Sequence, residues 1–456
     1  MRFMKFAPLV QNHKVFPKCA LTKPSHFHNL NNRTKPRPNE LLKQYLNTND
    51  TSTKALLLFR DLIRKNTSKI DSFSLLYMIK ICARNSSSIH DARPFHTLVV
   101  KLGYKPIIFI QTSLVSYYSC VGNLADAHQV FDEMPTKNVV SWTVLISAYV
   151  DNQKPKVGLK LFEKMQMENV APDHVTLTVA LSACADLGAL DTGKWIHNLV
   201  RRNKNIDKDL SLYNALLNMY TKCGDIGTAK ILFHDIKHKD VTTYTSMITG
   251  YAIHGQAKEA LALFKTMIDT KIVPNDVTFI GVLMACSHVS MVDDGKQYFK
   301  KMINRYRLKP RLSHYGCMVD LLCRAGCLQE AKDFILEMPM KPNAVIWRTL
   351  LSACSIRGDI DLAEEARGRL VEFEESLAGD DVIMSNVYAS KGIWEKKEIV
   401  RDRVNERRIP GRSWIEIGNE INEFVAADNE HIFTCNIYEI IESLKGNMRG
   451  FECSFD

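Results

Sequence analysis

The chain has 456 residues, 46% of them hydrophobic, and a formal net charge of +10. No stretch approaches the roughly 18 consecutive apolar residues of a membrane-spanning helix, so an integral membrane protein is not indicated. The 12 cysteines show no small disulfide framework, which argues against a secreted disulfide-rich domain and favours a compartment in which thiols stay reduced.

The N-terminal segment carries most of the net charge. Residues 1–39 contain eight Lys and Arg residues and no Asp or Glu, so the 52 basic residues that remain nearly balance the 50 acidic ones. An acid-free basic segment with scattered apolar residues resembles an organelle transit peptide, and residues 1–38 are assigned to it. The alternative is a disordered basic arm that contacts phosphates. Because Ser and Thr are scarce here, a mitochondrial address is preferred to a chloroplast one.

Internal repeats dominate the rest of the chain. Cys82, Cys184 and Cys286 are spaced by a common interval of 102 residues, and several other residue types share that interval. Each interval divides into three units of unequal length. The units are about 36–71, 72–107, 108–138, 139–173, 174–209, 210–240, 241–275, 276–311 and 312–343.

Each unit has the apolar pattern of two helices. In unit 139–173, Trp142, Leu145 and Tyr149 recur at helical spacing, and Phe162 marks a second helix that ends before Pro172. One helical hairpin cannot bury its apolar face alone, whereas stacked copies bury a continuous core. The sequence therefore predicts an all-α fold, an α-solenoid of stacked helix-turn-helix repeats.

These units resemble a known family. They end in Pro-Asp or Pro-Asn and alternate in length near 35, 36 and 31 residues, as in plant pentatricopeptide repeat proteins of the P-L-S subfamily. Segments 130–135, 219–224 and 314–322 match that family, and the resemblance covers about residues 40–447. Tetratricopeptide repeats would keep a constant period of 34 residues. The resemblance implies a right-handed solenoid.

The resemblance also implies binding of single-stranded RNA, one base per repeat, with the fifth and last residues of each unit choosing the base. We call these two residues the base-reading pair. The pairs Thr112/Asn138, Thr143/Asp173, Asn214/Asp240 and Thr245/Asn275 imply A, G, U and A. The less regular first unit adds Asn39/Asp71 for U, and the middle-length units give Leu76/Ile107, Thr178/Asp209 and Ile280/Arg311.

The chemistry of the last residue fits such a code. A carboxylate only accepts hydrogen bonds, which suits the ring N–H of U and G, whereas an Asn amide also donates and suits A and C. The alternative for each Asp or Asn is a helix N-cap. Val140, Val175 and Val277 occupy the second position of their units, where the resemblance implies apolar contact with bases; ordinary packing is the alternative.

The C-terminal part changes pattern after Asn343. Residues 344–409 still predict two helix pairs and resemble the E1 and E2 motifs of RNA-editing members of the family. Residues 410–448 resemble the PG-box and part of the E+ region, with a β-hairpin around Gly418-Asn419, a last helix at about 430–448 and a tail at 449–456. By resemblance, a protein partner docks on Trp414, Ile415, Ile417 and Phe424.

No catalytic motif accompanies these segments. The zinc-dependent cytidine deaminase (DYW) domain of longer members needs His-x-Glu and Cys-x-x-Cys, and neither spacing occurs in the 456 residues. Cys323 and Cys327 are four residues apart on a repeat helix, where packing is preferred to metal binding. The expectation is a chain that is not an enzyme and uses no metal or cofactor, in the E/E+ class without the deaminase domain.

The function implied by the resemblance is recognition of a site for C-to-U editing in an organellar transcript. The partners would be single-stranded RNA, a deaminase acting in trans and multiple-site editing accessory proteins, with no membrane. Two alternatives stay open: an organellar factor for RNA splicing, stabilisation or translation, and a protein-binding helical scaffold. The implied RNA is U, any, A, G, any, U, A, any, any, three spacers, then the edited C.

Overall fold

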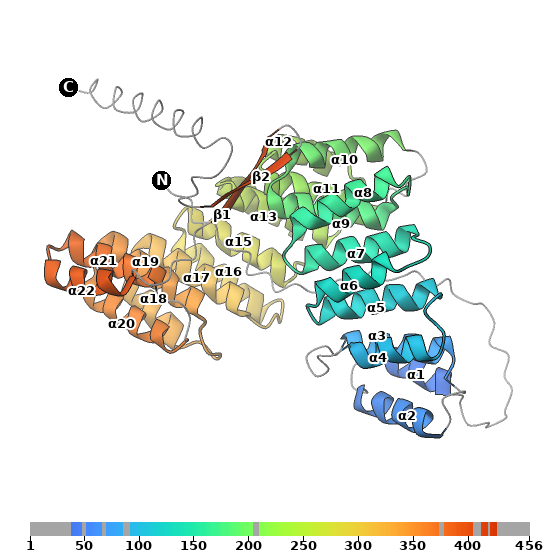
Figure 1. Ribbon diagram of the computed structural model, residues 1–456. Helices are drawn as coiled ribbons and strands as arrows, with labels where there is room; N and C mark the ends of the chain where they lie inside the picture. The colour runs from blue at the N-terminus through green and yellow to red at the C-terminus, as the bar shows by residue number, and fades with distance from the viewer. Residues whose placement is uncertain are drawn as a thin grey trace. The chain divides into compact units, whose positions relative to one another are not determined.

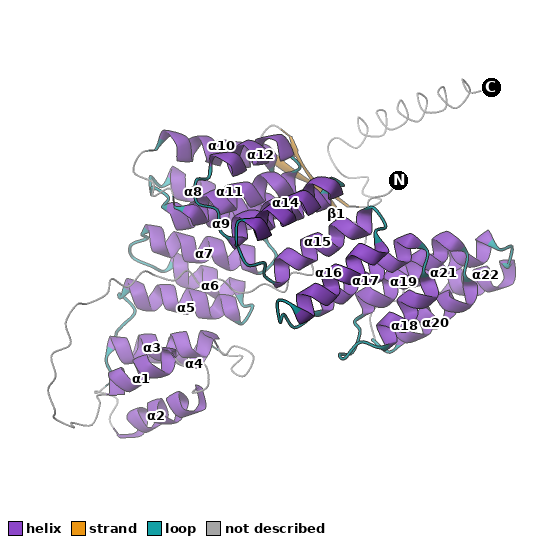
Figure 2. Cartoon of the chain, turned by 180° about the vertical axis from the view of Figure 1, so that it is seen from behind, coloured by secondary structure: helices purple, strands orange, loops and turns teal. Residues whose placement is uncertain are grey.

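A computed structural model describes residues 38–47, 52–65, 70–84, 92–203, 209–373, 378–404, 412–417 and 420–425. These residues form 22 α-helices and two β-strands, so the predicted all-α repeat class is confirmed. Figure 2 shows that helices dominate the chain. No helix in the described ranges is both long and apolar enough to cross a membrane. The segment 1–37, the predicted last helix at about 430–448 and the tail at 449–456 lie outside the described residues.

The chain forms two compact units, which divide between Cys223 and Gly224. Odd-numbered helices of the first unit pack on one another in series, and each even-numbered helix packs beside the odd-numbered helix before it (Figure 1). The helices of the first unit are α1 (Pro38–Asn47), α2 (Ser52–Lys65), α3 (Ser72–Arg84), α4 (Arg93–Lys101), α5 (Ile108–Cys120), α6 (Leu124–Asp132), α7 (Val139–Asp151), α8 (Pro155–Met167), α9 (His174–Leu187), α10 (Leu190–Arg202) and α11 (Leu210–Cys223).

The second unit repeats this arrangement. Helices α13, α15, α17, α19 and α21 pack in series, with α14, α16, α18, α20 and α22 beside them. The elements of the second unit are α12 (Ile226–Asp235), α13 (Val241–Ile253), α14 (Ala257–Asp269), α15 (Asp276–His288), α16 (Val292–Asn304), α17 (Leu312–Ala325), α18 (Leu328–Leu336), α19 (Ala344–Arg357), α20 (Ile360–Val371), α21 (Ala378–Ser390), α22 (Trp394–Val404), β1 (Arg412–Ile417) and β2 (Glu420–Val425).

The hairpin α7–α8 illustrates why these sequences fold this way. Trp142, Leu145 and Ile146 recur on one face of α7 and are fully buried. Each such side chain contributes about 1.5–3 kcal/mol through removal of apolar surface from water. The Trp142 ring meets the Phe131 ring of α6 edge-on, with centroids 4.7 Å apart. Pro155 opens α8, where its missing N–H costs no helical hydrogen bond.

Helix starts follow the sequence period. Helices α3, α5, α7, α9, α11, α13, α15, α17 and α19 each begin at the first residue of a unit derived from the sequence. The last residue of one unit therefore precedes the first helical turn of the next. This placement brings a polar side chain to the N-terminus of a helix in every unit except 72–107, which ends in Ile107.

The cysteines at the 102-residue interval lie in the core, as predicted. Cys82, Cys184 and Cys286 are fully buried free thiols. Burial raises the pKa of Cys82 and Cys286 to about 12, so both remain protonated and act as small apolar residues.

The predicted β-hairpin is present. Strands β1 and β2 pair antiparallel, with Ser413 opposite Phe424 and Ile417 opposite Glu420. The docking residues Trp414, Ile415, Ile417 and Phe424 lie on these strands, and the contacts of their side chains are outside the described part of the structure.

Candidate nucleic-acid interface

The last residues of the base-reading pairs are helix N-caps. Asn138, Asp173, Asp240 and Asn275 each accept a hydrogen bond through Oδ1 from the backbone N–H three residues later, at 2.8–2.9 Å. Asp209 caps α11 in the same way. Such a cap stabilises a helix by about 1 kcal/mol.

In Asp173 and Asn275 the cap leaves one side-chain atom for another partner. In Asn275, both the backbone N–H and the hydroxyl of Thr278 donate to Oδ1, so Oδ1 is the carbonyl oxygen and Nδ2 points away from the helix. In Asp173, Oδ2 occupies the position that Nδ2 has in Asn275. No protein hydrogen bond in the described ranges uses Asp173 Oδ2 or Asn275 Nδ2. The same cap therefore presents an acceptor when the residue is Asp and a donor when it is Asn.

In unit 139–173 the structure brings the two members of the pair together through a third residue. Thr143 is one turn into α7 and is only 6% exposed. Its Oγ1 lies 2.6 Å from Oγ1 of Thr176 and 2.8 Å from the carbonyl oxygen of Val139. The Thr176 hydroxyl donates to Asp173 Oδ1 at 2.7 Å. A continuous hydrogen-bonded chain thus joins the fifth and last residues.

Unit 241–275 has the same arrangement. Thr245 Oγ1 lies 2.7 Å from Thr278 Oγ1, and the Thr278 hydroxyl donates to Asn275 Oδ1 at 2.8 Å. The first unit is more direct: the Asn39 amide donates to Asp71, and the Ser74 hydroxyl donates to Asn39. Asn39 and Asp71 therefore adjoin, although the first unit is the least regular in sequence.

Two other predicted pairs are not joined in this way in the described ranges. Thr112 donates to the Phe109 carbonyl at 3.1 Å, and no protein hydrogen bond in the described ranges links it to Asn138. The Thr178 hydroxyl donates to the His174 carbonyl oxygen at 2.8 Å. Leu212, which follows Asp209 by three residues as Thr176 follows Asp173, is apolar and cannot link the pair.

The pair Asn214/Asp240 falls across the division of the chain. Asn214 lies in the first unit, where it is 8% exposed, and its partner Asp240 lies in the second unit.

Several second residues of the units are apolar and accessible to solvent. Val140 and Val277 are 48% and 36% exposed, and Val175 is half-buried. Sequence reasoning missed two stronger candidates at the same position, Phe73 and Phe109. Their exposed rings stack with centroids 5.7 Å apart and planes 20° apart. The register alone could have identified them, because each follows the first residue of its unit. Aromatic faces of this kind stack on nucleic-acid bases.

The unit 276–311 ends differently, because Arg311 supplies no oxygen acceptor. His314 fills the gap: its Nδ1 accepts from the Arg311 N–H at 3.0 Å, and its Nε2 lies 2.8 Å from the Asp276 carbonyl oxygen. This geometry requires a neutral ring with the proton on Nε2. Burial accordingly lowers the pKa of His314 below its ordinary value of 6.5.

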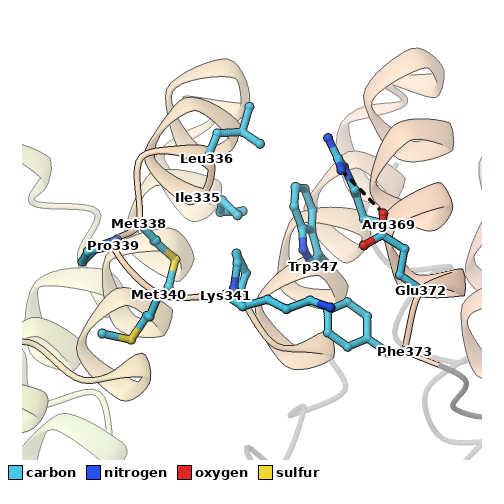
Figure 3. Close-up of a pocket in the computed structure, with 11 residues that line it drawn as sticks. Ile335, Leu336, Met338, Pro339, Met340, Lys341, Trp347, Arg369, Glu372 and Phe373 are labelled. Atoms are coloured by element: carbon cyan, nitrogen blue, oxygen red, sulfur yellow. Dashed lines mark ion pairs between the residues drawn. The ribbon is translucent and has the colours of Figure 1, made fainter.

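A shallow pocket of about 390 Å³ lies beside the loop between α18 and α19 (Figure 3). Lys341 Nζ lies 5.2 Å from the centre of the Phe373 ring, and Arg369 Cζ lies 6.0 Å from that of Trp347. Arg369 also pairs with Glu372 at 3.5 Å. The two cations of this pocket lie against aromatic rings, and one also pairs with a carboxylate. These contacts indicate a structural role rather than a catalytic one.

Catalytic groups are not assembled in the part of the chain that the structure describes. No group of three or more His, Cys, Asp or Glu residues there could hold a metal ion. Burial raises the pKa of Cys317 and Cys323 to about 12, which makes both thiols poor nucleophiles and poor metal ligands.

Comparison with known families gives matches over most of the repeats. The family model described as "PPR repeat family" matches residues 137–186 and 239–288, and that described as "PPR repeat" matches 112–139, 211–241 and 313–342. The model described as "E motif" matches residues 358–416. No catalytic domain is among these matched models.

Three similar proteins are pentatricopeptide repeat-containing proteins of Arabidopsis thaliana. One, named as chloroplastic and mitochondrial, is 36% identical over 93% of this chain and 68% of its own length. One named as chloroplastic is 37% identical over 85% and 52%, and one named as mitochondrial is 36% identical over 82% and 58%. The chain thus spans about half to two thirds of the length of these relatives.

Among solved structures, the maize pentatricopeptide repeat protein PPR10 aligns with a TM-score of 0.42 and 19% identity, over 82% of this chain and 59% of that one. The same protein in complex with an 18-nucleotide psaJ RNA element aligns with a TM-score of 0.37 and 14% identity, over 80% and 68%.

Proposed function

Because this chain belongs to the pentatricopeptide repeat family, we propose that it binds single-stranded RNA and selects a cytidine for C-to-U editing in an organelle. The observation that carries the proposal is the geometry of the base-reading pairs. Asp173 and Asn275 have their inner oxygen held by a helix cap and their outer atom left for a base. The outer atom accepts in one unit and donates in the other, which is the property a base code needs.

The exposed second residues support the same function. Within one repeat, an exposed apolar side chain and a polar group of set polarity would suit a base that stacks on the first and hydrogen-bonds to the second. The body of the chain is nearly neutral outside the N-terminal segment, so hydrogen bonds and stacking would provide selectivity that a general attraction to phosphate does not.

The RNA proposal is tested with purified protein and short fluorescent RNAs. The expected RNA carries U, any, A, G, any, U, A, any, any, three spacers and C, and the control has the same bases in scrambled order. We expect tighter binding of the expected RNA by at least tenfold at physiological salt. Equal affinity for the two RNAs would sink the proposed code.

The editing role rests on the segment that matches the E motif. We propose that this segment and the β1–β2 hairpin recruit a deaminase in trans, together with multiple-site editing accessory proteins, and that Trp414, Ile415, Ile417 and Phe424 contribute to docking. A variant that ends after Val404 retains α1–α22. It should bind RNA as the full chain does but fail to restore editing in a plant that lacks the protein.

Sequencing of organellar transcripts in that plant separates the alternatives. Loss of C-to-U conversion at one or a few cytidines, with the expected bases upstream, would support the editing role. Normal editing with unspliced or depleted transcripts would move the function to splicing or stabilisation. The names of the relatives include both organelles, and we propose the mitochondrion. A fusion of residues 1–38 to a fluorescent protein tests that address.

A further inference from the structure

The shallow pocket beside the loop between α18 and α19 lies where the last repeat meets the segment that matches the E motif (Figure 3). Its volume of about 390 Å³ falls within the roughly 300–1,000 Å³ of small-ligand sites. We call it the Lys341 pocket. Its lining includes two cations, one carboxylate, two aromatic rings and an aliphatic side chain: Lys341, Arg369, Glu372, Trp347, Phe373 and Ile335.

The repeat register shows why this corner is open. Positions 131, 233 and 335 are spaced by the 102-residue interval and hold Phe, Phe and Ile. The rings of Phe131 and Phe233 each meet an aromatic ring at the fourth position of the next helix edge-on, with centroids 4.7 and 5.3 Å apart. Trp347 is the fourth residue of α19, but Ile335 brings no ring to it. The corner beside Trp347 is therefore left open.

A lysine recurs at the same interval, as Lys137, Lys239 and Lys341. The first two lie over the Phe rings just described, with Nζ 5.4 and 5.0 Å from the ring centres. Because position 335 has no ring, Lys341 extends instead toward Phe373, which follows α20, and its Nζ lies 5.2 Å from that ring centre (Figure 3). The ammonium group thus lies on the wall of the pocket.

The charges of the pocket favour an anion. Lys341 forms no ion pair with a carboxylate in the described ranges. Arg369 Nη1 lies 3.5 Å from Glu372 Oε1, and both side chains are about half exposed. Two cations and one carboxylate leave one net positive charge. Since the contacts of Lys341 and Arg369 with aromatic rings hold both cations in place, they are already positioned when an anion arrives.

The pocket also lies beside a base-reading position. Asn343, the last residue of unit 312–343, follows Lys341 by two residues and caps α19, with its Oδ1 3.2 Å from the Ile346 nitrogen. In the expected RNA this unit faces the ninth base. The tenth base, the first of the three spacers, therefore comes next to the pocket.

We propose that the Lys341 pocket binds the tenth nucleotide, with the base stacked on Phe373 and the phosphate held by Lys341 and Arg369. The base takes the place of the Lys341 ammonium over the ring, and the ammonium pairs with the phosphate. This exchange is favourable because a base stacks on a ring more strongly than an exposed lysine does. The inference rests on the proposed RNA binding, and it adds a nucleotide that no base-reading pair contacts.

A nucleotide suits this pocket better than an acidic peptide. A carboxylate side chain would use the two cations and leave the exposed part of the Phe373 ring without a partner, whereas a nucleotide uses both. Sites for single-stranded nucleic acid combine cations with aromatic rings in this way. Stacking accepts any base, so we expect no base preference at the tenth position.

The first test uses the full chain and the expected RNA with an abasic nucleotide at the tenth position. Loss of the base should weaken binding about 5- to 150-fold, the range for one base stacked on an aromatic side chain. Exchange of the tenth base for any other should change affinity less than about twofold. An abasic nucleotide at the twelfth position, the last spacer, is the control and should have no effect.

Phe373→Leu removes the ring and keeps an apolar side chain. In this variant the abasic nucleotide at the tenth position should cost less than about twofold, because no ring remains to stack on. The matched control is Phe334→Leu on α18. Phe334 is half-buried and packs on Phe299 and Tyr315, with ring centres 5.8 and 5.6 Å away. This control should lose stability and keep the full effect of the abasic nucleotide.

Lys341→Met gives an independent readout through salt. The slope of log affinity against log salt concentration should become shallower by about 0.7, the value for one phosphate contact on a single strand. Lys341→Arg should keep the slope. Lys332→Met removes the same charge from a lysine that pairs with Glu365 at 2.6 Å, and should also keep it.

Glu372→Gln should act in the opposite direction. It removes the one carboxylate of the pocket, so RNA binding should become about two- to fivefold tighter. Weaker or unchanged binding by this variant would contradict a phosphate beside Arg369.

The outcomes separate this inference from the proposed function. A wild-type protein that binds expected and scrambled RNA equally would overturn the proposed function. A wild-type protein that prefers the expected RNA but tolerates the abasic nucleotide would overturn the inference, as would an equal abasic effect in wild type and Phe373→Leu. Unchanged RNA binding with lost editing in Lys341→Met would assign the pocket to a protein partner and would also overturn it.

Discussion

Replacement of Asp173 separates its role as a helix cap from the base contact that we propose for it. Asp173→Ala removes the acceptor for both the N–H and the hydroxyl of Thr176, at 2.8 and 2.7 Å. The lost cap costs about 1 kcal/mol, and the lost bond to a charged group costs about 1.5 kcal/mol more. We expect about 2–3 kcal/mol of lost stability. Asp173→Asn keeps an oxygen for both donors and should cost less than about 0.5 kcal/mol.

The two variants should also differ in RNA binding: Asp173→Asn should change which base is preferred, and Asp173→Ala should lose the preference. In Asp173→Asn an outward amide replaces an outward carboxylate oxygen, so the preferred fourth base should change from G to A. If the contact resembles base-edge contacts in DNA, the ratio of affinities should move by about 1–3 kcal/mol, or roughly 5- to 150-fold. Asp173→Ala should bind all fourth bases weakly and with little preference.

Fluorescence anisotropy with four RNAs that differ only at the fourth base measures the preference, and urea unfolding followed by circular dichroism measures stability. Asn275→Asp is the reciprocal variant and should change the seventh base from A to G. A folded Asp173→Asn variant that binds the four RNAs in the same order as the wild type would show that Asp173 does not select the fourth base.

Three further predictions concern stacking, pH and helix packing. Phe73→Ala and Phe109→Ala should each weaken RNA binding by about 1–3 kcal/mol without changing the order of preferred bases. Titrations with matched and mismatched RNAs measure both effects, and a change of order would contradict a stacking role. Because the pKa of His314 is lowered by burial, the folded chain binds fewer protons than the unfolded chain below pH 6.5. Its contribution to stability should be full above pH 6.5 and disappear as the pH falls through the lowered pKa, and urea unfolding at several pH values should show a weaker pH dependence in His314→Gln. Gly295→Ala should destabilise the second unit by about 1–3 kcal/mol in thermal unfolding, because its new methyl group would meet a leucine of α17, whereas Gly316→Ala on α17 meets nothing within 4 Å and should be neutral or stabilising.

Much of the fold follows from periodicity. The 102-residue interval and the apolar spacing within units predicted where the first helices begin, because core packing repeats with the helix pair. The buried register of Cys82, Cys184 and Cys286 was predicted for the same reason. The strand pairing around Gly418-Asn419 was predicted from alternating apolar and polar residues. Such features follow from residues that recur at a fixed spacing, and that spacing can be read directly from the sequence.

Features that depend on which side chains meet across two helices were not predictable from the sequence. Thr112 and Thr143 are the same residue at the same position, yet only Thr143 joins a hydrogen-bonded chain to its partner. The difference lies in the next helix, where Ser141 turns its hydroxyl to the backbone and Thr176 does not. Sequence analysis also treated the N-cap and the base contact as alternatives. The caps use one atom of each group, so the two roles are compatible.

That compatibility bears on how such a chain could change its target. Asp and Asn are nearly equal as N-caps, and the backbone of Asp173 is extended, with φ −91° and ψ 178°, a conformation open to either residue. If Asp173 reads a base as we propose, a single substitution would exchange one base for another with almost no loss of fold stability. A new transcript could then be acquired one base at a time, through intermediates that all remain folded.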